Sequence, residues 1–141
     1  MKKIFFYLVC VFMLSCSNRN DIDYIVSVEW DKCEDSKNCI IDFACLMGFE
    51  WDAMCFYSGG NSLEDINEDL GFELKEYTDT GDIVIFLNKG KVVYQKTWFY
   101  NPSKPPKGVI FITDLKKIRV NKSEAKFEIK KVNKAFYLEK I

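Results

Sequence analysis

The segment Trp51–Tyr57 has apolar side chains at both its odd and its even positions, so a strand formed by it would be apolar on both faces. A strand with two apolar faces is expected inside a fold, covered on both sides. Gly59 and Gly60 follow and supply a permissive connection to the next element. The pattern therefore predicts an interior strand that leads into a glycine turn.

A short helix is predicted from Ser62 to Leu70. Ser62 stands at the N-cap position, and Asp65 occupies the capping-box position three residues later. Gly71 suits the left-handed position just past the helix end, where Phe72 can fold back onto the last turn. One narrow apolar stripe is formed by Leu63, Ile66 and Leu70. A helix this short needs tertiary packing, so we expect it to lie on a sheet.

The rest of the chain alternates apolar runs with turns. Asn88–Lys91 predicts a tight turn with glycine in the left-handed position, and the proline-rich stretch Asn101–Gly108 predicts a loop. The strands predicted around these turns are Ile83–Leu87, Val92–Tyr100, Val109–Thr113, and a last hairpin that contains Phe127, Ile129, Phe136 and Leu138 and turns near Asn133. Ile22–Trp30 shows no clear period of two and no clear helical period, so it receives no assignment. The predicted fold is α+β: an antiparallel sheet of five or six strands with one short helix packed on a face.

The first fifteen residues have the layout of a secretory signal peptide. Lys2 and Lys3 precede an apolar run from Ile4 to Leu14, and the small residue Ser15 stands before Cys16. The run is far shorter than the roughly 20 apolar residues that a membrane-spanning helix needs, which disfavours a retained transmembrane anchor. We therefore predict an exported protein.

Met13-Leu14-Ser15-Cys16 resembles the bacterial lipobox, whose cysteine is acylated and becomes the first residue of the mature protein. The resemblance implies lipidation of Cys16, and Ser17 is similar to the residue type that sends such proteins to the outer membrane. Each buried methylene contributes about 0.8 kcal/mol, so several acyl chains, palmitate among them, hold a protein durably. The alternative is plain secretion with a spare cysteine.

These boundaries define the expected organisation of the chain. Residues 1–15 are the signal peptide, residues 16–23 a lipidated polar tether, and residues 24–141 a single domain. A segment of that length has room for one hydrophobic core.

Four cysteines remain beyond Cys16, namely Cys33, Cys39, Cys45 and Cys55. An even number allows three complete pairings in an oxidising compartment. One of them joins the first two and the last two, and each short loop closed in this way contributes roughly 2–3 kcal/mol if it is unstrained. Buried free thiols are the other interpretation. A redox dithiol is disfavoured, because the sequence has no C-x-x-C motif and no histidine to lower a thiol pKa.

Charge is distributed unevenly along the chain. Residues 17–88 hold seventeen acidic and four basic side chains, whereas residues 89–141 hold fourteen basic and four acidic ones. We interpret the two halves as neutralising each other on the surface of one domain. The alternative is a basic sheet face that recognises acidic partners such as anionic glycans or lipid head groups. Nucleic acid is not an expected partner of an exported protein.

The sequence offers little for catalysis. The absence of histidine removes Ser-His-Asp and Cys-His chemistry and the commonest zinc ligand, and we expect no metal and no cofactor. Asp65, Glu68 and Asp69 could form a carboxylate site, yet a solvated helix face accounts for them equally well. Ser58–Ser62 contains two glycines but lacks the Lys-Ser/Thr pair of a phosphate loop.

The candidate recognition residues lie where the strand Val92–Tyr100 meets the proline-rich loop. They are Trp98, Tyr100, Lys104 and Lys107. Side chains alternate across a strand, which places Phe99 opposite Trp98 and Tyr100, so at least one face of this aromatic run is expected in the core. Prolines keep the loop stiff and so reduce the entropy lost on binding.

A family resemblance adds to this interpretation. The succession of Phe49-Glu50-Trp51-Asp52, an aromatic strand, an acidic helix closing on Leu-Gly-Phe, an Ile-Val-Ile-Phe strand and a Lys-Gly-Lys-Val-Val hairpin resembles a group of small bacterial cell-envelope lipoproteins of undefined biochemical role. Its helix-then-meander layout is distantly similar to the small lipoprotein subunit of the outer-membrane protein assembly machine. The resemblance covers Asp42 to Thr113. It implies a fold and a compartment, and no functional residue beyond Cys16.

The function predicted from the sequence is that of a non-catalytic envelope lipoprotein, anchored to the outer membrane by its N-terminal lipid, whose domain binds or scaffolds another envelope component. The expected partner is an envelope protein or an acidic glycan. One alternative is a membrane-anchored immunity or inhibitor protein, and another is an enzyme that uses the acidic cluster.

Overall fold

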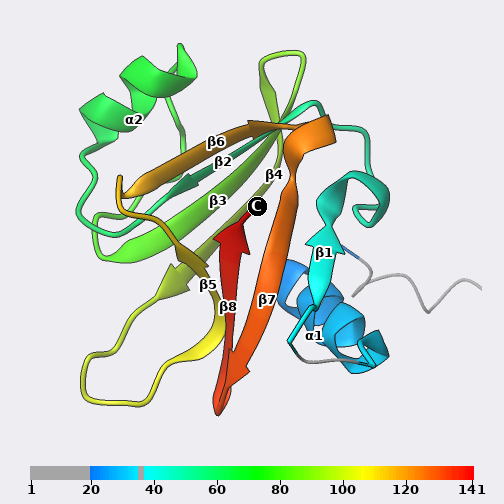
Figure 1. Cartoon of the computed structure of the whole chain (residues 1–141). Coiled ribbons are helices and arrows are strands. Elements are labelled where there is room, and N and C mark those ends of the chain that lie inside the picture. The colour runs from blue at the N-terminus through cyan, green and yellow to red at the C-terminus, as the bar shows by residue number, and fades with distance from the viewer. Residues whose placement is uncertain (1–19, 35–36) are drawn as a thin grey trace, which may run out of the picture.

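The computed structural model describes residues 20–34 and 37–141, so the predicted signal peptide and Cys16 lie outside the described residues. Within that part of the chain the elements are α1 (Ile22–Lys32), β1 (Ile40–Asp42), β2 (Ala53–Tyr57), α2 (Leu63–Leu70), β3 (Gly81–Asn88), β4 (Lys91–Phe99), β5 (Lys107–Ile112), β6 (Lys117–Asn121), β7 (Lys126–Val132) and β8 (Lys134–Lys140), as Figure 1 shows. Short 3-10 turns occupy Phe43–Cys45 and Lys122–Glu124.

The eight strands form two four-stranded sheets. Sheet 1 has the order β1-β7-β8-β5 and sheet 2 the order β4-β3-β2-β6. All neighbours are antiparallel except β5 and β8, which run parallel. The predicted α+β class is confirmed, and so is the short helix on a sheet. The prediction of five or six strands in one sheet was too low, because β1 and β6 were not predicted. The strands also form two sheets and not one.

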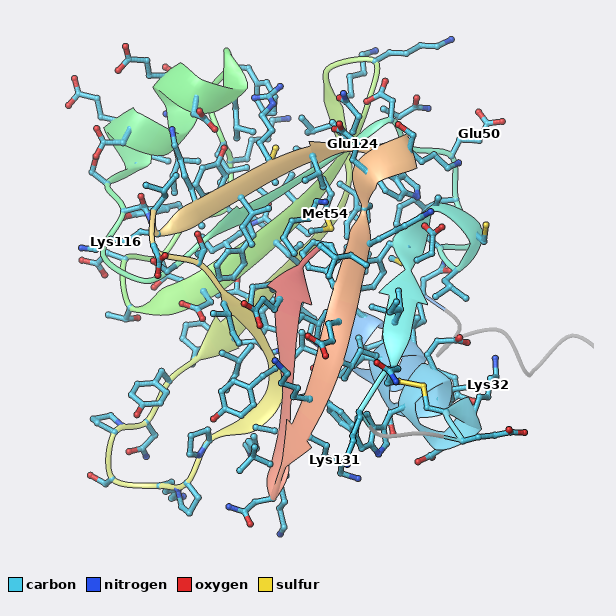
Figure 2. The ribbon with its side chains drawn as sticks, viewed as in Figure 1. Lys32, Glu50, Met54, Lys116, Glu124 and Lys131 are labelled. Atoms are coloured by element: carbon cyan, nitrogen blue, oxygen red, sulfur yellow. A yellow bond between two sulfur atoms is a disulfide. The ribbon has the colours of Figure 1, made fainter. Side chains whose placement is uncertain are left out.

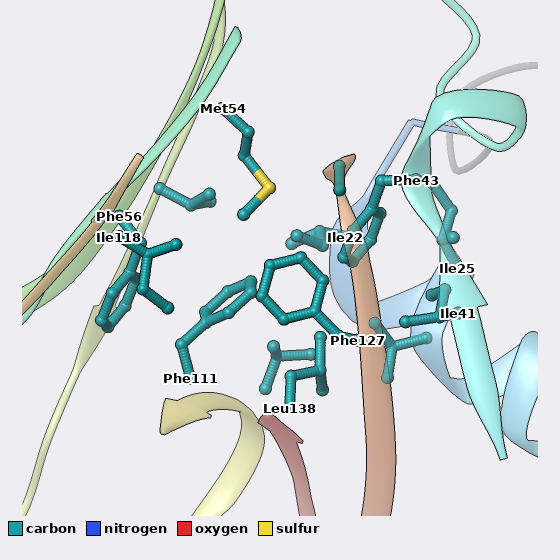
Figure 3. Close-up of a cluster of buried hydrophobic side chains, with 14 of the residues drawn as sticks. Ile22, Ile25, Ile41, Phe43, Met54, Phe56, Phe111, Ile118, Phe127 and Leu138 are labelled. Carbon is teal, nitrogen blue, oxygen red and sulfur yellow. The ribbon is translucent and has the colours of Figure 1, made fainter. Parts of the chain in front are cut away.

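The main hydrophobic core lies between the two sheets. Figure 3 shows Met54, Phe56 and Ile118 of sheet 2 facing Phe127 and Leu138 of sheet 1. Rings meet edge to face here, as in the pair Phe111 and Phe127, whose centroids are 5.3 Å apart. The opposite face of sheet 2 is covered by α2, which forms a second, smaller core with it.

The prediction that the strand in Trp51–Tyr57 is covered on both sides is confirmed. β2 lies between β3 and β6, and Met54, Cys55, Phe56 and Tyr57 are all buried. Met54 and Phe56 belong to the core between the sheets, whereas Cys55 and Tyr57 belong to the core beneath α2. Alternation of side chains therefore places each strand face in a different core.

The helix α2 forms as its caps predict. The Asp65 amide donates to Ser62 Oγ at 3.1 Å, and Gly71 adopts φ 81° and donates its N–H to the Asn67 carbonyl. Ile66 and Leu70 are buried on sheet 2. The hairpin turns at Lys89-Gly90 and at Asn133 are confirmed as well, since all three residues have positive φ between paired strands.

Ile22–Trp30, which received no assignment, is helical. Ile22, Ile25 and Val26 are buried against the inner faces of the sheets, and Trp30 packs on Phe136 of β8. Ile22 is 0% exposed and Asp21 caps the helix. The predicted tether of residues 16–23 therefore extended too far, because residues 21–23 belong to the folded domain.

One disulfide staples the end of α1 to the start of β1. Cys33 and Cys39 are bonded, with their Cα atoms 5.7 Å apart, and the yellow bond lies beside Lys32 in Figure 2. The second bridge, between Cys45 and Cys55, is not formed. Cys45 is exposed while Cys55 is buried beneath α2, and burial raises the pKa of the Cys55 thiol.

Candidate functional site

A set of hydrogen-bonded polar side chains lies where the N-terminus of α1 meets β4 and β5. Asp23 accepts hydrogen bonds from Trp98 Nε1 at 3.0 Å and from the Val109 amide at 3.1 Å. The Lys96 ammonium lies 2.8 Å from Asp23 and 3.0 Å from Asp21, and the Ile22 amide donates to the Tyr94 hydroxyl. We call the side chains of this set the α1 anchor cluster: Asp21, Asp23, Tyr94, Lys96 and Trp98.

Electrostatics stabilise this cluster in its charged form. Burial acts to raise the pKa of Asp21, but hydrogen bonds from Lys96 and from the Asp23 amide outweigh it and hold that pKa below its usual value. Burial likewise acts to lower the pKa of Lys96, and its hydrogen bonds to Asp23 and Asp21 raise it instead. The cluster is therefore a structural ion-pair network at neutral pH.

The α1 anchor cluster was not predicted from the sequence. Ile22, Ile25, Val26 and Trp30 in fact follow a helical spacing, with Asp21 in the capping position, but Tyr24 and Val28 add apolar side chains on other faces and hide the stripe. The partners Lys96 and Trp98 stand more than seventy residues away in sequence. No local pattern could have connected them to Asp21 and Asp23.

The acidic first half and the basic second half of the chain pair in several places. Besides Lys96 with Asp21 and Asp23, Lys117 lies 3.0 Å from Asp69, and Lys126 lies 3.9 Å from Asp42. These contacts agree with the interpretation that the two halves neutralise each other. Several lysines of the second half nevertheless gather at one place on the surface.

The predicted recognition residues surround one cavity, which we call the β4–β5 groove. It has a volume of about 640 Å³ and lies where the yellow loop projects at the lower left of Figure 1. Its lining includes all four of the predicted residues, Trp98, Tyr100, Lys104 and Lys107, together with Asp82, Phe99, Asn101, Pro105, Pro106, Val109, Ile110, Asn133 and Lys134.

The aromatic side chains of this groove have different roles. Phe99 and Tyr100 are 74% and 66% exposed, so their rings are available for contact. Trp98 points inward, donates to Asp23 and lies 6.3 Å from Phe111, so it mainly holds the groove to the core. Phe99 was not among the predicted site residues, although it is the most exposed of the three rings.

The loop that closes the groove is internally bonded. Asn101 accepts hydrogen bonds from the amides of Ser103 and Lys104, both at 3.0 Å. Gly108 ends the loop with φ 80°, and a Cβ there would lie 3.2 Å from Asp23 Oδ1. Glycine is therefore needed where the loop turns into β5 beside the α1 anchor cluster.

Charge in the groove is mainly positive. Lys104, Lys107 and Lys134 are exposed on its rim. The carboxylate present, Asp82, already accepts a hydrogen bond from the Gly59 amide at 2.8 Å. The groove can therefore hold a ligand that combines apolar groups with negative charge.

The carboxylates of the alternative acidic site, Asp65, Glu68 and Asp69, also lie close together. They line a separate polar cavity of about 550 Å³ beside α2, together with Tyr57 and Lys117. Asp69 accepts from the Tyr57 hydroxyl at 2.6 Å and pairs with Lys117. Burial acts to raise the pKa of Asp69, but these hydrogen bonds lower it. The Ser62 hydroxyl donates to Asp65. Two of the three carboxylates thus have structural partners that hold α2 in place.

Among the described residues, no three potential metal ligands cluster, and neither helix is long and apolar enough to cross a membrane. Comparisons with protein-family models, with curated proteins and with solved structures find no match to this chain.

Proposed function

We propose that this protein is a non-catalytic lipoprotein of the bacterial outer membrane whose β4–β5 groove binds an acidic region of another envelope component. The observation that carries this proposal is the gathering of Tyr100, Lys104 and Lys107 with the exposed ring of Phe99 around one cavity. Aromatic side chains are enriched in binding hot spots, where they supply contact area at low entropic cost.

The construction of the groove favours binding over chemistry. Its lysines are exposed and its loop is held by Asn101 and by three prolines, so little entropy is lost when a partner docks. Exposed lysines steer an acidic partner and fix its orientation. The residues that line this cavity include no serine, threonine, cysteine or histidine.

The membrane anchor rests on the sequence around Cys16. We expect the parent protein to partition into the detergent phase of a detergent separation and the Cys16→Ser variant to move to the aqueous phase. Conversion of Cys10, which belongs to the predicted signal peptide, to serine is the matched control and should leave partitioning unchanged. Identical behaviour of the parent and the Cys16→Ser variant would remove the anchor from the proposal.

The binding role is tested by crosslinking in intact cells followed by purification of the protein with its partner. The double variant Lys104→Glu/Lys107→Glu should retain its melting temperature, since exposed charges contribute little to stability, and should lose partner capture. The control Lys126→Glu/Lys140→Glu makes the same charge change on exposed positions of sheet 1. Capture that survives the groove variant, or that is insensitive to salt in the physiological range, would contradict the proposal.

A further inference from the structure

Among the residues that the structure describes, β4 presents the longest open sheet edge. It has nine residues and ends the order of sheet 2. No main-chain hydrogen bond joins β4 to any described residue outside β3. In an antiparallel pair, the main-chain groups of alternate residues point away from the neighbour. The outer edge of β4 therefore offers a row of free donors and acceptors.

The other sheet edges are short or partly covered. β1 has three residues and β6 has five. β5 has six, and its Val109 amide is already bonded to Asp23. Proteins usually keep edge strands short, charged or covered, because an open edge pairs with other chains. β4 contains no proline, and the ammonium of its Lys96 is committed to Asp21 and Asp23.

A cavity lies at each end of this edge. One is the β4–β5 groove, to which β4 contributes Trp98 and Phe99. The other, which we call the β4-edge groove, has about 610 Å³ and is lined on one side by the consecutive residues 90–95 and on the other by residues 72–76. Side chains alternate across a strand. Consecutive strand residues can line one cavity only from the edge or the end of the strand, so each cavity reaches the edge of β4 or one of its ends.

The edge between the two cavities is regular. β4 carries a bulge where Tyr94 pairs with Phe86 and Val92 pairs with Leu87, which leaves Val93 as the extra residue. From Tyr94 to Phe99 the register is continuous. An extended peptide added along this stretch would pair its main chain with β4 and would place its two ends in the two grooves.

We infer that the β4–β5 groove recognises its acidic partner as an extended peptide that pairs with the edge of β4. This inference rests on the proposed function and specifies its partner. The end of the peptide near Lys104 and Lys107 is acidic. Its other end is neutral and apolar, because the β4-edge groove combines Phe72, Leu74 and Val92 with two glutamates and two lysines.

The probe for this inference is a synthetic peptide of about ten residues that alternates valine and threonine and carries two glutamates at one terminus. It is labelled with a fluorophore and titrated with the full protein purified in detergent. Anisotropy should rise on binding, and hydrogen exchange of residues 91–99 should slow while exchange of β6 stays unchanged. Two control peptides carry N-methyl groups on alternate residues, one on the odd residues and the other on the even residues. An N-methylated residue cannot donate a main-chain hydrogen bond, so the peptide that is methylated on the residues facing β4 should fail to bind.

Charge reversal tests the direction of the peptide without disturbing the sheet. The Lys104→Glu/Lys107→Glu variant should bind the glutamate peptide about tenfold more weakly and should bind a lysine-ended peptide instead. The matched control, Lys126→Glu/Lys140→Glu, should bind like the parent protein.

Three outcomes would overturn the inference. An anionic oligosaccharide, tested as oligogalacturonate, that binds at the same lysines without protecting residues 91–99 would indicate a glycan partner. Protection of β4 that appears without peptide and grows with protein concentration would indicate a second copy. Binding by both N-methylated peptides would exclude main-chain pairing. If partner capture in cells still depends on Lys104 and Lys107, the proposed function survives each of these results.

Discussion

The two helices of this protein differ in how much of their structure is set by local sequence. α2 is bounded by its own sequence, with the Ser62 hydroxyl at its start and Gly71 at its end, each bonded to residues within four positions. α1 is held by residues distant in sequence, since Asp23 bonds to Trp98 and Val109, 75 and 86 positions away. Local signals thus set both ends of α2, which Asp69 also ties to Lys117 of β6, whereas α1 adds contacts with β4 and β5 to its local Asp21 cap.

This difference predicts where each helix is vulnerable. α2 should respond to changes in its caps by amounts known from isolated helices. The stability of α1 should be reduced by substitutions in the sheets as strongly as by substitutions in α1 itself.

The largest effect is expected for Asp23→Ala. The substitution leaves the Trp98 indole N–H and the Val109 amide without their acceptor and removes one partner of Lys96. Unsatisfied groups of this kind cost about 1–3 kcal/mol each, so we expect a loss of about 3 kcal/mol in the free energy of unfolding, measured by urea denaturation. Asp31→Ala, at an exposed position of the same helix, should change it by less than about 0.5 kcal/mol. Equal effects of the two substitutions would show that α1 does not depend on its anchor cluster.

Removal of the disulfide comes next. The bridge closes a loop with a sequence separation of 6, for which chain entropy predicts about 2 kcal/mol. The double variant Cys33→Ser/Cys39→Ser should lose that amount, and a reducing agent should lower the stability of the parent protein but not that of the variant. A variant as stable as the oxidised parent would mean that α1 needs no covalent link to β1.

The caps of α2 give smaller effects. Gly71 has φ 81°, and a Cβ built there would meet no atom within 4 Å, so Gly71→Val is opposed by backbone conformation alone, at about 1–2 kcal/mol. Ser62→Ala removes an acceptor from the first turn and should lose about 1 kcal/mol. Thermal melting of both variants beside the parent measures these differences. Unchanged melting temperatures would show that packing, and not capping, sets the ends of α2.

The smallest effect is a dependence on pH that both helices share. The pKa values of Asp21 and Asp69 are lowered in the folded protein, so each carboxylate contributes stability that is present above its unfolded pKa and is lost as pH falls through the folded value. Stability measured between about pH 5 and pH 2 should therefore fall less steeply in Asp21→Asn and in Asp69→Asn than in the parent. Parallel curves for all three proteins would rule out this contribution.

The sequence predicted those parts of the fold whose determinants are local. The hairpin turn at Gly90, the caps of α2 and the two apolar faces of β2 can each be recognised within ten residues. The division into two sheets could not be, because β6 joins β2 through pairs such as Cys55 with Arg119, and the parallel pairing of β5 with β8 depends on the path of the whole chain.

The residues of the candidate site likewise include some that local sequence predicts and others that only the fold brings together. Tyr100, Lys104 and Lys107 were predicted because an aromatic run and a proline-rich loop adjoin in sequence. Lys134 belongs to the same groove through the pairing of β5 with β8, in which it lies opposite Lys107. The inward role of Trp98 likewise follows from Asp23, a residue that the sequence analysis assigned to the tether.

The topology of sheet 1 also governs the order of folding. β1 finds its partner in β7, where Ile41 lies opposite Phe127, and β8 lies between β7 and β5. β1 and β5 thus have no sheet to join until residues 126–140 are present, whereas β2, β3 and β4 pair with one another as soon as they are made. Pairings as distant in sequence as that of β1 with β7 form slowly. In a chain exported through a signal peptide, as proposed, sheet 1 would therefore stay incomplete until the last residues have crossed the inner membrane. Because β7 and β8 supply Phe127 and Leu138 to the core between the sheets, the position of β8 in the middle of its sheet would then make closure of that core one of the last steps of folding.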